Sequence, residues 1–281
     1  MPVGSGTRHE KNAEVRRYSS FADDFVTTKD QDHRMPEDYR WIRTDVRSRF
    51  LSALSYGAAL VISSVWCRAA LHVRLRDRKL LRAARDGAFI YANHTQPVGD
   101  VFIPALASFP RRIYTVVSPA NLGIPVIGRI LPYLGALPIP DTLGGMRGFT
   151  EAVKTRADEG CNVVIYPEAH VWEYYTGIRP MPESAFTFPV RCAKPSYAMT
   201  VTYKKRRIGK KPAAVVHLDG PFYPDESLPP RRRAAALRDT VYAAMLERSR
   251  ESDTEYIRYE PAGAGNMDIQ DRSNTAVTEK G

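Results

Sequence analysis

Short apolar runs alternate with helical stretches from Ala88 to about residue 250, and this alternation constrains the fold more than any other feature of the sequence. An apolar run of four to eight residues between glycines, prolines or charges is typical of a strand. Strands that alternate with helices indicate an α/β sheet. We therefore predict a mixed sheet of at least six strands flanked by helices. The expected strands are residues 89–92, 113–118, 134–139, 162–166, 197–203 and 213–218.

The segments between these strands have the length and composition of helices. The last one has the clearest helical pattern, because Leu237, Val241 and Met245 repeat along one face. The expected helices are residues 101–108, 126–133, 143–159, 183–193 and 231–250.

An uncharged stretch of eighteen residues, 50–67, precedes this region and is at the lower edge of the ~17–25 residues needed to cross a bilayer. Basic residues flank it on both sides, with seven Lys/Arg and one acid in residues 68–85. We expect a helix that lies on, or dips into, an anionic membrane leaflet. The alternative is a buried core helix with a basic extension.

Length and composition suggest one large domain or two small ones, since domains average ~150 residues. We expect a polar arm with one short helix over residues 1–40 and a membrane-contacting helical region over residues 41–87. An α/β domain should cover residues 88–260, and a disordered tail residues 261–281.

Two stretches carry candidate catalytic groups. Residues 91–100 read YANHTQPVGD, in which His94 could act as a general base and Asp100 could orient its ring. The alternative is a surface histidine beside a helix-capping aspartate. In residues 163–172, VVIYPEAHVW, Glu168 follows a strand and lies at the same sheet edge as His94 if the strands are parallel. Glu168 could bind a hydroxyl group or orient a cationic partner. The alternative is a charge in a loop or at a helix N-cap. The role of His170 stays open.

The order of these blocks resembles that of the glycerolipid acyltransferases, most closely the 1-acylglycerol-3-phosphate (lysophosphatidic acid) acyltransferases. The resemblance covers residues 88–203: NH…D, a Gly/Pro-rich segment, the YPE block and a Pro-containing strand. It implies transfer of a fatty acyl group from a thioester to a lysophospholipid hydroxyl to give phosphatidic acid. It also implies that His94 is the base, Asp100 its support, and Asn93 and Glu168 part of the substrate site.

The sequence departs from the family pattern in the spacing of the catalytic pair and where the acceptor phosphate should bind. Five residues rather than four separate His94 from Asp100, and Gly99 could accommodate the extra residue. The family arginine after the glutamate is missing, because Glu168 is followed by Ala-His-Val. We expect Arg147 and Arg179 as substitute phosphate ligands, although either could be an exposed salt-bridging arginine.

Charge and composition indicate the partners. The net charge of +10 favours anionic partners, and residues 191–211 hold eight Lys/Arg and no acid. This basic segment could contact lipid head groups or coenzyme A phosphates, or be a solvated turn. We expect no nucleic-acid partner, because no recognisable nucleic-acid-binding motif is present. We expect a lysophospholipid, an acyl thioester (acyl-CoA or acyl carrier protein) and an anionic membrane surface.

The remaining expectations concern cofactors, location and rival functions. Acyl transfer needs no cofactor or metal. Three widely spaced cysteines and the lack of an apolar leader segment suggest the cytoplasmic face of the membrane, with peripheral or monotopic attachment. Two rivals stay open. One is a metal-dependent hydrolase using His94, Asp100, Glu168 and His170; the other is a non-catalytic lipid- or nucleic-acid-binding module.

Overall fold

The structure is a computed structural model that describes residues 14–26, 33–36 and 38–262. Its centre is a seven-stranded sheet in the order β2-β8-β7-β3-β6-β4-β5. Neighbouring strands run parallel except β7 and β8, which are antiparallel. This confirms the predicted mixed α/β sheet and all six expected strands. The strands are β2 (Arg74–Leu75), β3 (Ala88–Ala92), β4 (Ile113–Val117), β5 (Ala136–Pro138), β6 (Asn162–Ile165), β7 (Ser196–Lys204) and β8 (Ala213–Phe222).

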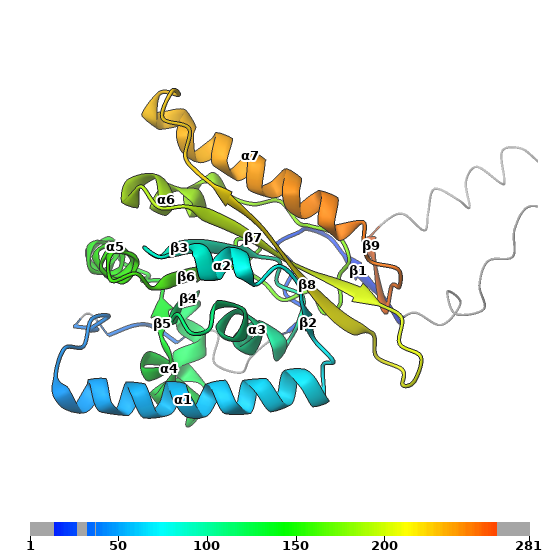
Figure 1. Ribbon diagram of the computed structural model, residues 1–281, viewed down its shortest axis with the longest axis horizontal. Helices are drawn as coiled ribbons and strands as arrows, with labels where there is room; N and C mark the ends of the chain where they lie inside the picture. Colours follow the sequence, from blue (N-terminus) through cyan, green and yellow to red (C-terminus); the bar gives the residue numbers. More distant parts are fainter. Residues whose placement is uncertain (1–13, 27–32, 37, 263–281) are drawn as a thin grey trace, which may run out of the picture.

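Helices cover both faces of the sheet (Figure 1). Helices α1 to α4 lie on one side, and α5 to α7 on the other. The expected helix over residues 183–193 is a 3-10 turn followed by a short α-helix. The helices are α1 (Val46–Ala69), α2 (Lys79–Ala83), α3 (Gly99–Ser108), α4 (Ile127–Leu134), α5 (Leu143–Asp158), α6 (Thr187–Cys192) and α7 (Pro230–Ser249), with 3-10 turns η2 (Pro119–Gly123) and η3 (Glu183–Phe186).

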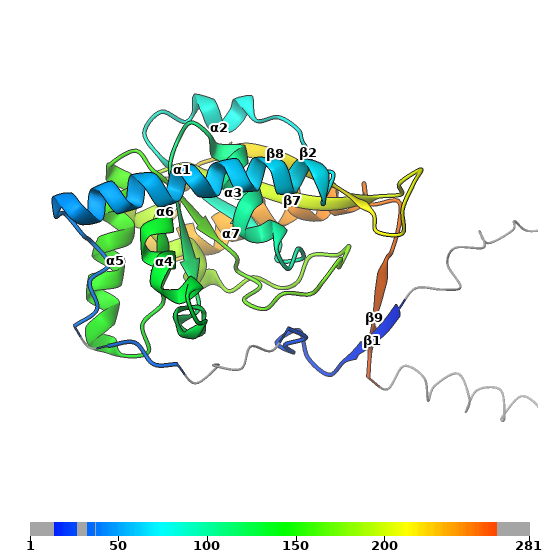
Figure 2. The same cartoon turned by 90° about the horizontal axis from the view of Figure 1, so that it is seen from below.

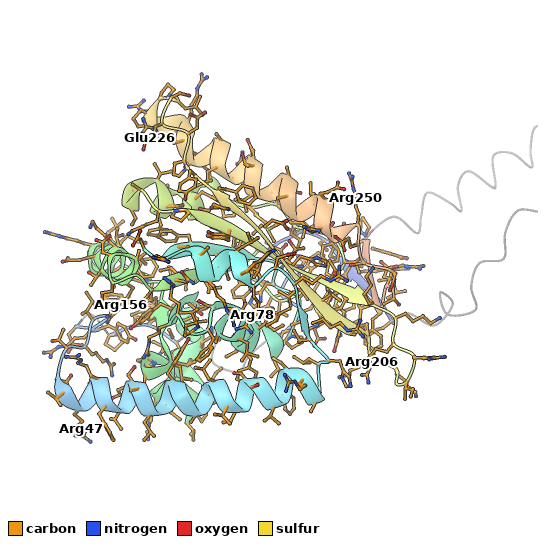
Figure 3. All side chains as sticks on the ribbon, in the orientation of Figure 1. Arg47, Arg78, Arg156, Arg206, Glu226 and Arg250 are labelled. Carbon is orange, nitrogen blue, oxygen red and sulfur yellow. The ribbon has the colours of Figure 1, made fainter. Side chains whose placement is uncertain are left out.

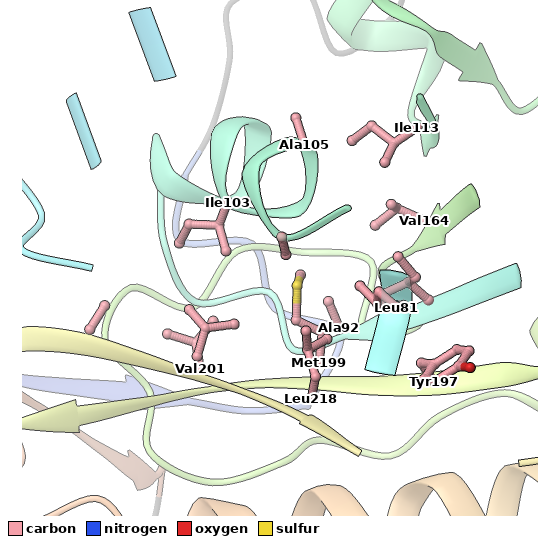
Figure 4. Close-up of a cluster of buried hydrophobic side chains, with 14 of the residues drawn as sticks. Leu81, Ala92, Ile103, Ala105, Ile113, Val164, Tyr197, Met199, Val201 and Leu218 are labelled. Carbon is pink, nitrogen blue, oxygen red and sulfur yellow. The ribbon is translucent and has the colours of Figure 1, made fainter. Parts of the chain in front are cut away.

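Strand β3 lies in the middle of the sheet and shows why its sequence is apolar throughout. Its five residues are fully buried. Ile90 and Ala92 point into the cluster beneath α2 and α3, whereas Phe89 and Tyr91 point into the cluster beneath α5 to α7. Figure 4 shows the first of these clusters, with Ile103 of α3 above the sheet residues. A strand with helices on both faces has no polar side.

Helix α1 begins after Asp45, whose carboxylate accepts the Ser48 N–H at 2.8 Å and caps the helix. It lies along α3 and α4 (Figure 2), and of its residues only Ser63 and Cys67 are buried. The opposite side is an exposed apolar stripe. The structure therefore does not support the alternative of a buried core helix. The stripe comprises Val46, Phe50, Leu54, Val61, Ile62, Val65 and Trp66.

By length and composition, α1 is the one helix in the described ranges that could cross a membrane. Its amino-terminal half contacts α4, where Ser52 Oγ donates to the Tyr133 carbonyl at 2.7 Å. Its carboxyl-terminal end lies near the turn that follows β3. Leu71, just after the helix, would lie 3.0 Å from a Cβ placed on Gly99. The end of this apolar helix is thus close to the turn that follows β3.

The described part of the N-terminal arm folds differently from our expectation. Residues 14–18 form strand β1 (Glu14–Tyr18), not a short helix, and pair in parallel with β9 (Ile257–Pro261). A local pattern cannot reveal this pairing, because the two strands lie at opposite ends of the chain. Residues 1–13 of the arm and 263–281 of the predicted tail lie outside the described residues. The domain boundaries at residues 40, 87 and 260 stay predictions, and β2 shows that the region before residue 88 contributes a strand to the sheet.

Candidate active site

The two candidate stretches meet at one edge of the sheet. Strands β3 and β6 are parallel neighbours, with Tyr91 opposite Ile165. The loops that follow them therefore leave the sheet at the same end, as the sequence predicted. Ligand and catalytic sites of open α/β sheets form at this carboxyl edge.

His94 and Asp100 form a hydrogen-bonded pair. His94 Nδ1 lies 2.7 Å from Asp100 Oδ2. Within the described ranges, no hydrogen bond reaches the other ring nitrogen, Nε2. The His94 side chain is 21% exposed. An ionised Asp100 places the proton on Nδ1, because a carboxylate only accepts hydrogen bonds. Nε2 is then the proton acceptor of a partly exposed side chain.

The turn between His94 and Asp100 accommodates five intervening residues, one more than in the family pattern. The Gln96 N–H donates to Asp100 Oδ2 at 2.9 Å, and the Asp100 N–H donates to the Gln96 carbonyl at 3.2 Å. Gly99 is required for close packing, since a Cβ there would lie 2.9 Å from the Gln96 Cβ. Asp100 is buried, and burial raises the pKa of its carboxyl group, opposed by the hydrogen bonds from His94 and the backbone.

Tyr166 supports this pair, and our sequence analysis assigned it no role. Its ring stacks on the His94 imidazole with centroids 4.4 Å apart. Its hydroxyl donates to the Asp100 carbonyl oxygen at 2.7 Å. The tyrosine of the YPE block therefore connects the loop after β6 to both members of the pair.

Glu168 and Arg179 form a buried ion pair beneath the His94 loop. Glu168 Oε2 accepts from Arg179 Nη2 at 3.0 Å and Nε at 3.2 Å, and Oε1 accepts the Arg179 N–H at 2.9 Å. Glu168 Oε2 also accepts the His94 N–H at 3.1 Å. Burial raises the pKa of the Glu168 carboxyl, and Arg179 opposes this effect. Both side chains are essentially inaccessible, at 0% and 1%. Binding of acceptor groups by these two residues stays a prediction; the contacts observed are those of loop positioning.

Asn93 and Arg147, the other expected substrate ligands, lie in different surroundings. Asn93 is buried, and its amide accepts the Val201 N–H at 2.8 Å and donates to the Val201 carbonyl at 3.0 Å. It therefore fastens the end of β3 to β7. Arg147 is exposed on α5, in a surface pocket with Thr150 and Lys154. No residue lining that pocket comes from the loops that hold His94 and Glu168.

A second set of contacts, which our sequence analysis missed, fixes the His94 loop from the other side. The Trp172 N–H donates to the His94 carbonyl at 3.0 Å, and the Tyr174 N–H donates to the Thr95 carbonyl at 2.8 Å. Trp172 is fully buried, and Arg179 lies over its ring at 4.8 Å. Aromatic residues of the described arm and of β9 surround Trp172: Tyr18, Phe21, Phe25 and Tyr259.

The arm also makes polar contacts with this loop. Trp172 Nε1 donates to the Asp23 carbonyl at 2.8 Å, and Arg179 Nη1 donates to the Phe21 carbonyl at 3.3 Å. His170 Nδ1 lies 3.4 Å from Asp24 Oδ2 at the surface. The carbonyl groups of Phe21 and Asp23 thus help to hold the loop that carries Glu168, whereas the His170–Asp24 contact lies at the surface.

The four residues of the rival metal site do not converge. Over the described residues there is no group of three or more His, Cys, Asp or Glu side chains placed to hold a metal ion. Glu168 is paired with Arg179 and His170 with Asp24, as described above. The geometry brings His94 and Asp100 together as a pair and not as members of a metal ligand set.

Comparisons with known proteins complete the description. No protein-family model matches the chain, and no curated protein sequence matches it. One similar solved structure is the 1-acyl-sn-glycerophosphate (LPA) acyltransferase PlsC from Thermotoga maritima. Its TM-score is 0.49 and its sequence identity 12%, and the match covers 74% of this chain and 99% of that chain.

Proposed function

We propose that the protein is an O-acyltransferase that moves a fatty acyl group from an acyl thioester to the hydroxyl of a lysophospholipid, with 1-acylglycerol-3-phosphate as the acceptor. The observation that carries the proposal is the pair of His94 and Asp100, in which Nδ1 is bonded to a buried carboxylate and Nε2 has no hydrogen-bond partner among the described residues. The NH…D and YPE blocks, which resemble those of the glycerolipid acyltransferases, support it.

The proposed reaction uses His94 first as a base and then as an acid. Nε2 takes the proton of the acceptor hydroxyl while its oxygen attacks the thioester carbonyl carbon. The C–S bond of the tetrahedral intermediate then breaks, and the imidazolium returns the proton to the leaving thiolate. Asp100 stabilises the imidazolium and fixes the ring orientation. Atoms and charges balance without a cofactor or a covalent enzyme intermediate.

We assign Glu168 and Arg179 to positioning rather than to acceptor binding. Their charges are paired with each other, and Glu168 also accepts the His94 N–H. If a catalytic base is misplaced by about 1 Å, the reaction rate can fall ~10²-fold. The two residues therefore contribute by keeping the backbone of His94 in place.

The apolar stripe on α1 supports a membrane-bound substrate. The side chains of Phe50, Leu54 and Val61 are 67%, 62% and 66% exposed. Contiguous exposed apolar surface of this kind marks membrane or protein contacts. We propose that α1 lies on the cytoplasmic leaflet as a monotopic anchor, with its carboxyl end close to the turn at Gly99.

The test is thiol release from palmitoyl-coenzyme A, with and without 1-acylglycerol-3-phosphate, together with detection of phosphatidic acid. We expect acceptor-dependent release by the wild type and a loss of about 10²–10⁴-fold in His94→Ala. His170→Ala is the matched control, since this imidazole lies outside the proposed pair and pairs with Asp24. It should keep wild-type activity, whereas a metal site using both histidines would lose activity in both variants.

The other outcomes are equally informative. Release without acceptor that disappears in His94→Ala would indicate a thioesterase. If the wild type releases no thiol with coenzyme A or acyl carrier protein donors across a panel of lysolipids, the proposal is wrong and a non-catalytic binding module becomes the better interpretation.

A further inference from the structure

A cavity lined by arginines lies at the end of the sheet opposite to His94. Its volume is about 180 Å³, and it is bounded by α1, α4, α5 and the first residues of β4 and β5. Arg112 directly precedes β4, whereas His94 follows the carboxyl end of the parallel strand β3. The cavity is therefore separate from the candidate active site.

Four guanidinium groups line the cavity, from Arg43, Arg49, Arg112 and Arg156, and no lining residue is acidic. Arg156 pairs with Glu159 through Nη1 at 2.7 Å. No ion pair to the other three is found in the part of the chain that the structure describes. The Asp45 carboxylate also interacts electrostatically with Arg43, so four cations face two carboxylates. This leaves an excess of two positive charges around a small polar space.

Aromatic rings hold three of these arginines without neutralising them. Arg112 lies over Tyr56 at 4.5 Å, Arg156 over Tyr114 at 4.7 Å, and Arg43 over Tyr133 at 5.3 Å. A cation over an aromatic face keeps its full charge and its N–H donors. The rings therefore fix the guanidinium groups in place while the charges remain available to a ligand.

The donors of the cavity are not all satisfied. Arg112 uses Nη2 to donate to Ser52 Oγ at 2.6 Å and to the Tyr133 carbonyl at 2.8 Å. The Nε atoms of Arg112 and Arg156 are buried and have no hydrogen-bond partner in the described ranges. Buried N–H groups are normally paired. The Nε atoms of Arg78 and Arg111, which do not line the cavity, also lack a partner, so the excess of arginines is the stronger argument for an anion site.

We propose that this cavity binds a phosphate group. Guanidinium groups match the oxygen geometry of a phosphate and can each donate two hydrogen bonds to it. An anion would also relieve the repulsion among the four cations. The phosphate could belong to an anionic lipid head group, because the cavity adjoins the amino-terminal end of α1, or to a free phosphorylated molecule. The inference does not depend on the acyl transfer proposed above.

Two arginines on α1 provide a matched pair of variants. Arg49 and Arg47 are both exposed and lie two residues apart, but only Arg49 lines the cavity. In Figure 3, Arg156 lies between α5 and α1, and Arg47 lies at the outer side of α1. Arg49→Gln and Arg47→Gln remove the same charge from the same helix, and neither side chain belongs to the core.

The experiment measures binding of inorganic phosphate to the full chain by isothermal titration calorimetry in 0.15 M NaCl. In parallel, flotation measures binding to phosphatidylcholine vesicles with and without phosphatidic acid. We expect saturable binding that Arg49→Gln weakens by about tenfold or more, since charge-assisted hydrogen bonds are lost. Arg47→Gln should change it less than about twofold, because Arg47 does not line the cavity and its charge acts only through screened solvent.

The two arms distinguish the sources of the phosphate. Binding of inorganic phosphate that depends on Arg49 supports a site for free phosphorylated molecules. An effect of Arg49→Gln confined to vesicles with phosphatidic acid supports a lipid head-group site. Absence of saturable binding in both arms, or equal weakening by the two variants, would overturn the proposal. The thiol-release assay reports on His94 alone, so failure here and failure of the proposed acyl transfer are distinguishable.

Discussion

Asp100→Asn is the most direct test of how the candidate site works. The substitution keeps the size of the side chain and an oxygen that can accept the Gln96 N–H, now 2.9 Å from Oδ2. It removes the negative charge that lies 2.7 Å from His94 Nδ1. If the amide instead placed its NH₂ group at the position of Oδ2, the ring proton would move to Nε2, and the Gln96 N–H, which donates to the same atom, would lose its acceptor. The change therefore removes the electrostatic support of the imidazolium and disfavours the tautomer required for a base.

The distance sets the expected size of the effect. The Nδ1–Oδ2 separation of 2.7 Å places the centres of the two charges roughly 4 Å apart. At an effective dielectric constant of about 20, their attraction is about 4 kcal/mol. A loss of this size in the transition state corresponds to roughly 10³-fold in rate. We therefore expect kcat to fall by about 10²–10⁴-fold.

The assay is the acceptor-dependent thiol release described above, with kcat and KM determined separately. The charge acts on a proton transfer and not on substrate binding, so KM should change little. Asp24→Asn is the matched control, because it makes the same substitution in another His–Asp contact, at 3.4 Å and at the surface. Circular dichroism and thermal unfolding show whether each variant is folded.

A folded Asp100→Asn variant with less than about a tenfold decrease in kcat would refute the reasoning. Asp100 would then serve as a cap for the turn at Gln96, and His94 would need another source of orientation. An equal loss in Asp24→Asn would be just as damaging, since it would place the effect outside the pair.

Three further predictions concern stability and membrane binding. Arg179→Met leaves Glu168 buried without its cation, so urea unfolding should show a loss of about 3–5 kcal/mol, partly restored by adding Glu168→Gln. Val61→Asp should weaken binding to anionic vesicles by about tenfold or more, because a valine that becomes buried in the membrane contributes about 1.5 kcal/mol or more to binding. Leu246→Asp on α7, the control, should leave this binding unchanged. Burial lowers the pKa of His217 in β8, so the native state binds fewer protons than the unfolded state as the pH falls through about 6.5. The wild type should therefore lose stability relative to His217→Gln between pH 7.5 and 5.5, measured by urea unfolding at each pH.

The parts of the fold that the sequence predicted are those whose pattern is local. The run Ala88–Ala92 is apolar at every position because both faces are covered, and its neighbours along the chain supply the helices. Strand β2 has only two residues, Arg74 and Leu75, and pairs with β8 far along the chain. No periodicity exists in two residues, so this strand could not be predicted. The pairing of β1 with β9 could not be predicted for a different reason, because these two strands lie at opposite ends of the chain.

The site shows the same division. His94 and Asp100 are six residues apart, so a tight turn between them could be inferred from Gly99. Arg179 was expected to bind phosphate, and its exposure cannot be inferred from sequence, because it depends on how the loop after Glu168 turns back. Trp172 is likewise held by the carbonyl of Asp23, 149 residues away.

These long-range contacts explain how a loop can hold a base rigidly. The backbone of His94 is fixed on both sides, since its N–H donates to Glu168 at 3.1 Å and its carbonyl accepts from Trp172 at 3.0 Å. The ring is fixed by Asp100 and by stacking on Tyr166. Within the described residues, Nε2 is the ring nitrogen without a hydrogen-bond partner. Residues near His94 in sequence thus supply the chemistry, and residues far from it supply the precision that proton transfer requires.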